Sequence, residues 1–407
     1  MASTTHDLLE GRPLISPADR RARVAVALLF LTNGAIFANL MPRYPAIIEA
    51  LDLSNAQFGL AVAAVPAGSL ASGLLAGILI RRLRSSRVAV GGMILTSGFV
   101  LLAGLAPSWA LLAGALFAVG ALDSVVDVAQ NTHGLRVQRL YGRSIINSFH
   151  AIWSLGAVLG GLMGGGAAAL GLSLGLHLTI SAVTFVIVNV VAYRFLLPGP
   201  EPREPVEASS SDRPAAPAKS VAYGALALLA VIAICGATVE DAGGTWAAVY
   251  LSGSLGAAPG IAAFGLVAVV GAQFVGRALG DRFVDRWGQA AVARAGGLLI
   301  ALGFGLALAF PSVPGTVAGF GLAGFGSATL IPGAMHAADQ LPGFRPGTGL
   351  TLLSWLLRAG FLLTPPLVGL IADASSLRMG LLVVPVAGII VVACSGVFRA
   401  HEQKVAR

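Results

Sequence analysis

Long apolar runs, separated by short polar segments, make up most of the chain. A helix needs about 20 apolar residues to cross roughly 30 Å of hydrocarbon, and in lipid only helices and closed barrels satisfy every backbone polar group. Runs of that length predict twelve membrane-spanning helices, at 23–41, 57–80, 88–106, 109–134, 145–169, 175–197, 221–250, 259–281, 290–310, 315–338, 349–372 and 378–398. The predicted fold is an all-α membrane protein.

One polar segment interrupts this series near the middle of the chain. Residues 198–219 read PGPEPREPVEASSSDRPAAPAK, a Pro-, Ser- and charge-rich composition that cannot bury apolar surface. We predict a flexible cytoplasmic linker there. The chain then divides into an N-terminal tail (1–22), a six-helix bundle (23–197), the linker, a second six-helix bundle (220–398) and a C-terminal tail (399–407).

Composition agrees with a lipid environment. Charged residues make up 11% of the 407 and apolar residues 56%, whereas a soluble domain carries roughly 25% charged residues. The two cysteines, Cys235 and Cys394, each lie inside an apolar run. They predict neither a disulfide framework nor a metal site, and we expect no cofactor.

The net charge of +8 could suggest a nucleic-acid partner, so the positions of the basic residues decide. Apart from Arg43, Arg378, Arg277 and Arg358, all Lys and Arg residues lie on the side that holds both termini and the linker. Basic residues near helix ends are retained in the cytoplasm. We therefore predict a multi-pass protein of the bacterial inner membrane with cytoplasmic termini, in contact with lipid and with no nucleic acid.

The two predicted bundles repeat each other in two places, as transporters built from internal repeats do. Gly77–Arg84 joins the second and third predicted helices, and Gly280–Gly288 joins the eighth and ninth. The fifth helix carries Gly156, Gly160, Gly161, Gly164 and Gly165, and the eleventh carries Gly360, Pro365, Pro366 and Gly369 at similar depth.

With these repeated segments, the helical region resembles the major facilitator superfamily over its whole length. Asp285, Arg286 and Gly288 are similar to that family's loop signature G-x-x-x-D-R-x-G-R, whereas the first copy has Arg81 in place of the usual Asp and Arg84 in place of Gly. The fifth helix resembles the antiporter signature G-x-x-x-G-P-x-x-G-G, with Gly161 in place of proline. The resemblance implies two six-helix halves that rock around a central substrate site.

Three blocks resemble the bacterial fucose permeases and related exporters: Asp127–Asn131, Asn147–His150 and Gly276–Arg286. For fucose permeases the implied proton and sugar sites are acidic residues in helices 1 and 4. Here helix 4 is acidic, but helix 1 offers only Asn33 and Asn39. Sugar symport is therefore not carried over directly.

Helix 4 carries the first candidate site, because an ionisable residue inside a membrane helix costs a few kcal/mol and is a functional candidate by default. Asp123, Asp127 and Asn131 lie at i, i+4 and i+8, on one helix face. Helices 1, 4, 7 and 10 line the cavity in the resembled family. We predict a proton or substrate site at one of the two aspartates; the alternative is a structural polar network.

Helix 7 supplies Glu240 and Asp241, followed by Trp246. Adjacent helical residues point about 100° apart, so one of the two acids is expected to face the pathway, with Glu240 favoured. The alternative is that both lie near the outer mouth of the protein, in contact with water.

Arg358, midway along the eleventh helix, is expected to meet Asp123, Asp127, Glu240 or an anionic substrate group. His150 and His336 suit a proton relay, although a hydrogen-bonded core role is the commoner one. Trp153, Trp246 and Trp355 could stack on a substrate ring or simply pack.

A charge cluster is expected at the cytoplasmic end of helix 8, with Arg277 and Asp281 forming an i, i+4 ion pair. With Asp285, Arg286 and the first-half Arg81 and Arg82, it suggests a cytoplasmic gate.

These features predict a secondary transporter, expected as a monomer, that moves a small organic molecule with proton coupling. Export is favoured, and sugar or organic-anion uptake is the alternative. Neither lysine, Lys219 or Lys404, follows a glycine-rich phosphate loop, which argues against an ATP-driven pump. An intramembrane enzyme lacks a catalytic motif in the right context, and a channel would need a continuous pore.

Overall fold

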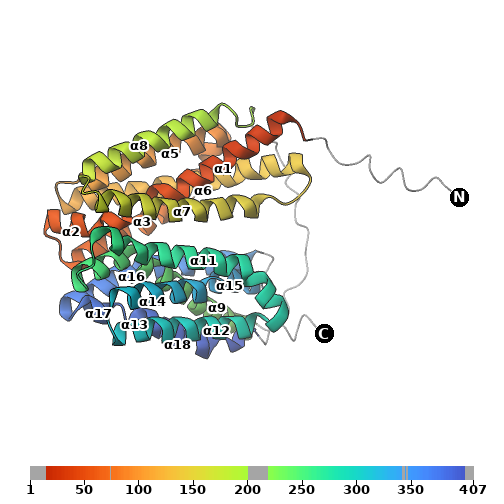
Figure 1. Ribbon diagram of the computed structural model, residues 1–407. Helices are drawn as coiled ribbons and strands as arrows, with labels where there is room; N and C mark the ends of the chain where they lie inside the picture. Colours follow the sequence, from red (N-terminus) through yellow and green to blue (C-terminus); the bar gives the residue numbers. More distant parts are fainter. Residues whose placement is uncertain (1–14, 74, 200–218, 342–343, 345–346, 399–407) are drawn as a thin grey trace.

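The structure is a computed structural model that describes residues 15–73, 75–199, 219–341, 344 and 347–398. Every regular element in these ranges is a helix. Two bundles lie side by side, the first built from α1–α8 and the second from α9–α18 (Figure 1). Most of the predicted linker and both predicted tails beyond residues 15–22 lie outside the described residues.

The first half contains eight α-helices and one 3₁₀ turn. Their bounds are α1 (Pro17–Ala38), η1 (Met41–Arg43), α2 (Tyr44–Leu51), α3 (Asn55–Ser72), α4 (Leu75–Leu83), α5 (Ser85–Gly104), α6 (Trp109–Tyr141), α7 (Ile146–Ala169) and α8 (Leu174–Tyr193). Serine side chains cap several of them, and Ser16 and Ser54 each form a reciprocal capping box with the residue three positions on.

The second half contains ten α-helices and three π-helical turns. Their bounds are α9 (Lys219–Asp241), η2 (Ala242–Trp246), α10 (Ala247–Val249), η3 (Tyr250–Ser254), α11 (Pro259–Trp287), α12 (Gln289–Leu298), η4 (Leu299–Phe304), α13 (Gly305–Ala309), α14 (Val313–Ser327), α15 (Leu330–Asp339), α16 (Thr348–Ala374), α17 (Leu377–Gly380) and α18 (Val383–Cys394).

The described residues contain 11 spans long and apolar enough to cross a membrane, or 12 when the bent pair α3 and α4 is counted as one span. The predicted all-α membrane fold is therefore confirmed. The predicted helix ends at residues 80 and 281 fall a few residues short, because α4 continues to Leu83 and α11 to Trp287. A polar sequence at a helix end protrudes beyond the lipid and can remain helical in water.

Glycines let the helices within each half approach closely. A Cβ at Gly156 or Gly160 of α7 would clash with backbone carbonyls of α1, at Leu31 and Ala35. Lipid gives no hydrophobic drive for helix association, so such close contacts contribute through van der Waals packing. Gly156 and Gly160 therefore let α7 pack closely against α1.

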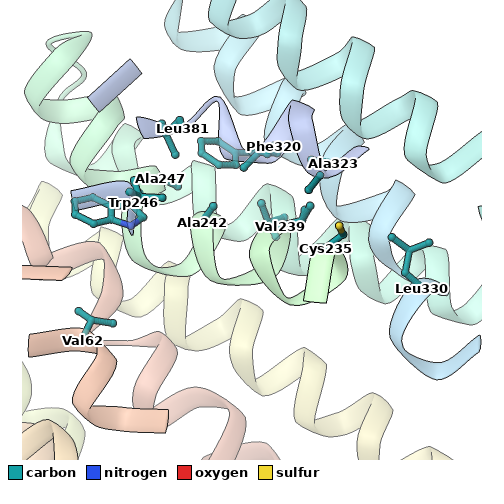
Figure 2. Packing of buried hydrophobic residues seen from close by; sticks show 14 of the residues in the cluster. Val62, Cys235, Val239, Ala242, Trp246, Ala247, Phe320, Ala323, Leu330 and Leu381 are labelled. Carbon is teal, nitrogen blue, oxygen red and sulfur yellow. The ribbon is translucent and has the colours of Figure 1, made fainter. Parts of the chain in front are cut away.

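The halves also meet each other, and they do so at one end of the bundle. We call this the distal end; it bears α2 and α17, whereas α1 begins and α18 ends at the opposite, proximal end (Figure 1). Gly59 of α3 abuts Pro365 of α16, and Gly165 of α7 abuts Ala263 of α11. Figure 2 shows the core of the second half, with Trp246 reaching toward the first half, where Val62 lies.

Candidate functional site

Three helices of the first half meet at Asp123. The Asn33 side-chain amide on α1 donates a hydrogen bond to Asp123 Oδ1 on α6 over 3.0 Å. The Trp153 indole N–H on α7 donates in turn to Asn33 Oδ1 over 2.7 Å. The chain Trp153–Asn33–Asp123 therefore fixes the position of an acid in the middle of the membrane span.

Asp127 lies one turn further along α6 and is exposed. Its Oδ1 accepts hydrogen bonds from the side chains of Asn131, at 3.0 Å, and Gln130, at 3.4 Å. The charge of Asp127 also interacts with His150 of α7 and with Arg358 of α16. The predicted face of α6 thus looks toward the second half.

Across from these groups, Arg358 is half-exposed and forms no hydrogen bond or ion pair with any described residue. The expected direct pairing with Asp123, Asp127 or Glu240 is therefore wrong for the described residues, although the charge of Arg358 reaches Asp127. We call the following set the central cluster: Asn33, Asp123, Asp127, Asn131, His150, Trp153 and Arg358.

Glu240 and Asp241 point in different directions, as adjacent helical residues must. Glu240 Oε2 accepts hydrogen bonds from the Gln273 amide at 2.9 Å and from Arg277 at 3.4 Å, both on α11. The Arg277–Asp281 pair that helical spacing predicted is wrong, because the structure pairs Arg277 with Glu240 instead. The guanidinium of Arg277 pairs with the acid on the neighbouring helix and not with the acid on its own helix.

Asp241 lies in the closed distal end. Thr245 donates to its Oδ1 at 3.2 Å, while its Oδ2 is enclosed and has no hydrogen-bond partner among the described residues. The hydroxyl of Tyr44 and the indole N–H of Trp246 are enclosed without partners as well. Phe58 makes edge-to-face contacts with both rings, at centroid distances of 5.0 Å and 5.5 Å. Trp246 is fully buried and packs against Phe58 while the distal end is closed.

Sequence reasoning missed a further contact at the distal end. The carboxylate of Asp373, near the end of α16, accepts hydrogen bonds from the backbone amides of Asn55 and Ala56, each at 2.9 Å. The Asn55 side chain donates to the same carboxylate at 2.9 Å. An acid from one half thus caps the first turn of α3 in the other, where it also complements the helix dipole. No local pattern in the sequence marks it.

The remaining predicted residues lie apart from the central cluster. Asn39 is buried inside the first half, and its side-chain Oδ1 lies 2.9 Å from His177 Nε2. His336 is exposed near the proximal end and bonds to Gln340 on its own helix. Trp355 is 57% exposed on α16, three residues before Arg358.

The predicted gating residues are exposed at the proximal end: Arg81, Arg82, Asp281, Asp285 and Arg286. Among the described residues no ion pair joins α4 to α11. Arg286 instead lies over the ring of Trp287, 5.7 Å from its centroid.

No group of three or more His, Cys, Asp or Glu side chains in the described ranges is placed to hold a metal ion.

Comparisons with known proteins agree with this architecture. Residues 26–283 match the sequence profile of the Major Facilitator Superfamily. The uncharacterized transporter y4wD of Sinorhizobium fredii is 32% identical over 356 residues, which cover 87% of this chain and 92% of that protein.

Two solved structures share the fold. A bacterial homologue of the human lysosomal transporter Spinster, inward-facing and unoccupied, aligns with a TM-score of 0.73 and 16% identity, covering 95% of this chain and 98% of that one. A D-xylose-proton symporter aligns with a TM-score of 0.70 and 16% identity, covering 93% and 97%. The chain is a multi-pass membrane transporter and belongs to the Major Facilitator Superfamily.

Proposed function

We propose that this transporter is a proton-coupled exporter of a small organic solute and works by alternating access around the central cluster. The observation that carries the proposal is the arrangement of charge between the halves. Two acids lie one turn apart on α6 at mid-span, and the charge of one of them, Asp127, interacts across the interface with Arg358 of α16. Such groups are expensive within a membrane and mark solute or proton pathways.

Proton coupling is supported by the way in which the two acids are held. Asp123 receives one hydrogen bond, from Asn33, whereas Asp127 receives two and is exposed. Desolvation favours the neutral form of a carboxyl group, and water or a nearby cation favours the charged form. An acid that alternates between these surroundings as the halves rock takes up a proton on one side and releases it on the other.

The closed distal end supports alternating access over a channel. Gly59 against Pro365, the Tyr44–Phe58–Trp246 contacts and the Asp373 cap all join the two halves there. At the proximal end the candidate gating residues are exposed and unpaired with one another in the described parts of the chain. This asymmetry is what one of two alternating states requires.

Export is the direction that the glycines of α7 favour, because their spacing resembles the antiporter signature and they line both the α1 and α11 contacts. Uptake of a sugar or an organic anion by proton symport is the second candidate. The glycine at position 161, where the antiporter signature has proline, weakens the support for export.

The surroundings of the protein are part of the proposal. We place it in the bacterial inner membrane, as a monomer, with the proximal end and both termini in the cytoplasm. The distribution of Lys and Arg along the sequence supports this orientation.

Transport by reconstituted vesicles tests the proposal. Purified protein would be screened by thermal shift against sugars, organic acids and drugs, and each hit loaded into vesicles that hold a pH-sensitive dye. Solute movement down its gradient is expected to drive protons across the membrane, and Asp127→Asn is expected to abolish the proton signal. Asp339→Asn, an exposed acid near the proximal end, is the control. Unchanged solute flux after collapse of the pH gradient would exclude proton coupling.

A further inference from the structure

Arg358 lies on the face of α16 that meets the first half. Pro365 and Gly369, about two and three turns further along the helix, pack against Gly59 and Asn55 of α3. Spacings of 7 and 11 residues return to nearly the same side of a helix, so Arg358 shares that face. The exposed leucines of α16, such as Leu356, Leu363 and Leu367, lie on the opposite side. Arg358 therefore points into the interface between the halves and not into lipid.

Four arginines lie away from the basic proximal end, and of these only Arg358 lacks a partner within the described residues. Arg277 donates to Glu240, Arg43 donates to the carbonyl of Leu172 at 2.8 Å, and Arg378 donates to the carbonyl of Ala309 at 3.2 Å. A guanidinium at mid-membrane depth requires water, an acid or a bound anion to offset its desolvation.

The nearest opposite charge belongs to Asp127, which does not complete an ion pair with Arg358. One oxygen of that carboxylate is engaged by Asn131 and Gln130, from its own helix. The two charges interact across the interface without direct contact. The space between the halves therefore has a positive side, at α16, and a negative side, at α6. An anionic group that enters this space is attracted to the α16 side and repelled from the α6 side.

We infer that Arg358 binds the carboxylate or phosphate group of an organic anion, which is the substrate class of this transporter. The inference rests on the proposed transport function and adds the charge of the solute to it. The guanidinium fork matches both groups in two parallel hydrogen bonds. Trp355, one helical turn before Arg358 and 57% exposed, supplies an aromatic side chain close to this site along α16.

Chemical modification of Arg358 provides the test. The full-length protein, in a maltoside detergent without phospholipid, would be treated with phenylglyoxal, and modification of Arg358 followed by peptide mass spectrometry. Inorganic phosphate, phenylacetate, 2-phenylethanol and 2-phenylethylamine would be added as protecting probes. Phenylacetate or phosphate is expected to slow modification about tenfold, the effect of one charge-assisted hydrogen bond. The neutral and cationic probes are expected to have no effect.

Each other outcome counts against the inference. An unreactive Arg358 would mean that its guanidinium is already paired, and equal protection by all three phenyl compounds would indicate a site that ignores charge. Absence of protection by both anions would also overturn it. Phosphatidylglycerol micelles form a separate arm: protection by the lipid alone would assign the site to a lipid headgroup and remove the solute from it.

Variants separate charge from packing. Arg358→Lys keeps the cation and Arg358→Gln removes it, while Arg378→Gln removes a distal cation that contacts Ala309. The apparent affinity for phenylacetate, measured from its thermal stabilisation of the protein, is expected to fall about tenfold in Arg358→Gln. It is expected to stay unchanged in Arg378→Gln. Vesicle transport of a neutral or cationic solute, with proton coupling intact, would leave the proposed transporter standing and refute the anion site alone.

Discussion

The carboxylate of Asp373 accepts a hydrogen bond from the backbone amide of Asn55 over 2.9 Å, although the two residues belong to opposite halves of the protein. The same carboxylate binds the next amide and the Asn55 side chain. These bonds exist only while the distal end is closed, because rocking the halves apart would separate α16 from α3. In the proposed alternating-access cycle they therefore stabilise the state in which the distal end is closed.

Asp373→Asn should shift the protein toward the state with an open distal end. We expect the variant to lose about 1 kcal/mol of this stabilisation, or about fivefold in the ratio of closed to open molecules, after allowing for the exposure of Asp373. The shift is measured by introducing a cysteine at the distal end and following its reaction with a membrane-impermeant thiol reagent. Asp52→Asn changes an exposed distal acid that forms no side-chain hydrogen bond or ion pair in the described structure, and it should leave accessibility unchanged.

Gly59→Ala should act in the same direction through packing. An added Cβ would clash with the carbonyl of Pro365, so the halves must separate or strain, at a cost of about 1–3 kcal/mol. Gly98→Ala is the matched control, since a Cβ there meets nothing within 4 Å and should be neutral or stabilising. Thermal unfolding in detergent compares the two variants, and equal stability would contradict the close contact between α3 and α16.

Asn33→Ala should destabilise the first half. The change leaves the Trp153 indole N–H without its acceptor and Asp123 Oδ1 without its donor, which costs about 1–3 kcal/mol for each polar group left buried. The readout is the unfolding temperature in detergent. Asn147→Ala, an exposed position on α7, controls for loss of an asparagine. Equal unfolding temperatures for the two variants would show that the three-residue chain does not hold Asp123.

A double-mutant cycle should distinguish the two possible partners of Arg277. We expect Arg277→Gln and Glu240→Gln to couple by about 0.5 kcal/mol, a modest value because both side chains are partly exposed. Arg277→Gln and Asp281→Asn should combine additively. Coupling to Asp281 in place of Glu240 would restore the local helical pair that spacing alone predicted.

The length of the apolar runs was sufficient for the fold, since about 20 consecutive apolar residues have few other stable conformations than a membrane helix. Helical spacing also placed Asp123, Asp127 and Asn131 on one face of α6, because that statement depends only on the geometry of a single helix. The bent second span and the helical ends at Leu83 and Trp287 were missed, since apolar length says little about where a helix stops outside lipid.

Contacts between helices were beyond the reach of the sequence. The chain Trp153–Asn33–Asp123 depends on the register of three helices, and Arg277 prefers Glu240 of a neighbouring helix over the local Asp281. Asp373 binds backbone amides, which carry no side-chain signature at all. The separation of Glu240 from Asp241 was predictable in kind, but their different partners were not.

Distances between spin labels at the two ends test alternating access most directly. In a background with Cys235 and Cys394 replaced, one labelled pair would be placed at Asp52 and Ser254 on the distal end and another at Leu140 and Trp287 on the proximal end; these positions are exposed. Conditions that lengthen the distal distance, such as Asp373→Asn, are predicted to shorten the proximal one in the same molecules. Lengthening of both distances together, as in an opening channel, or independence of the two, would contradict the account.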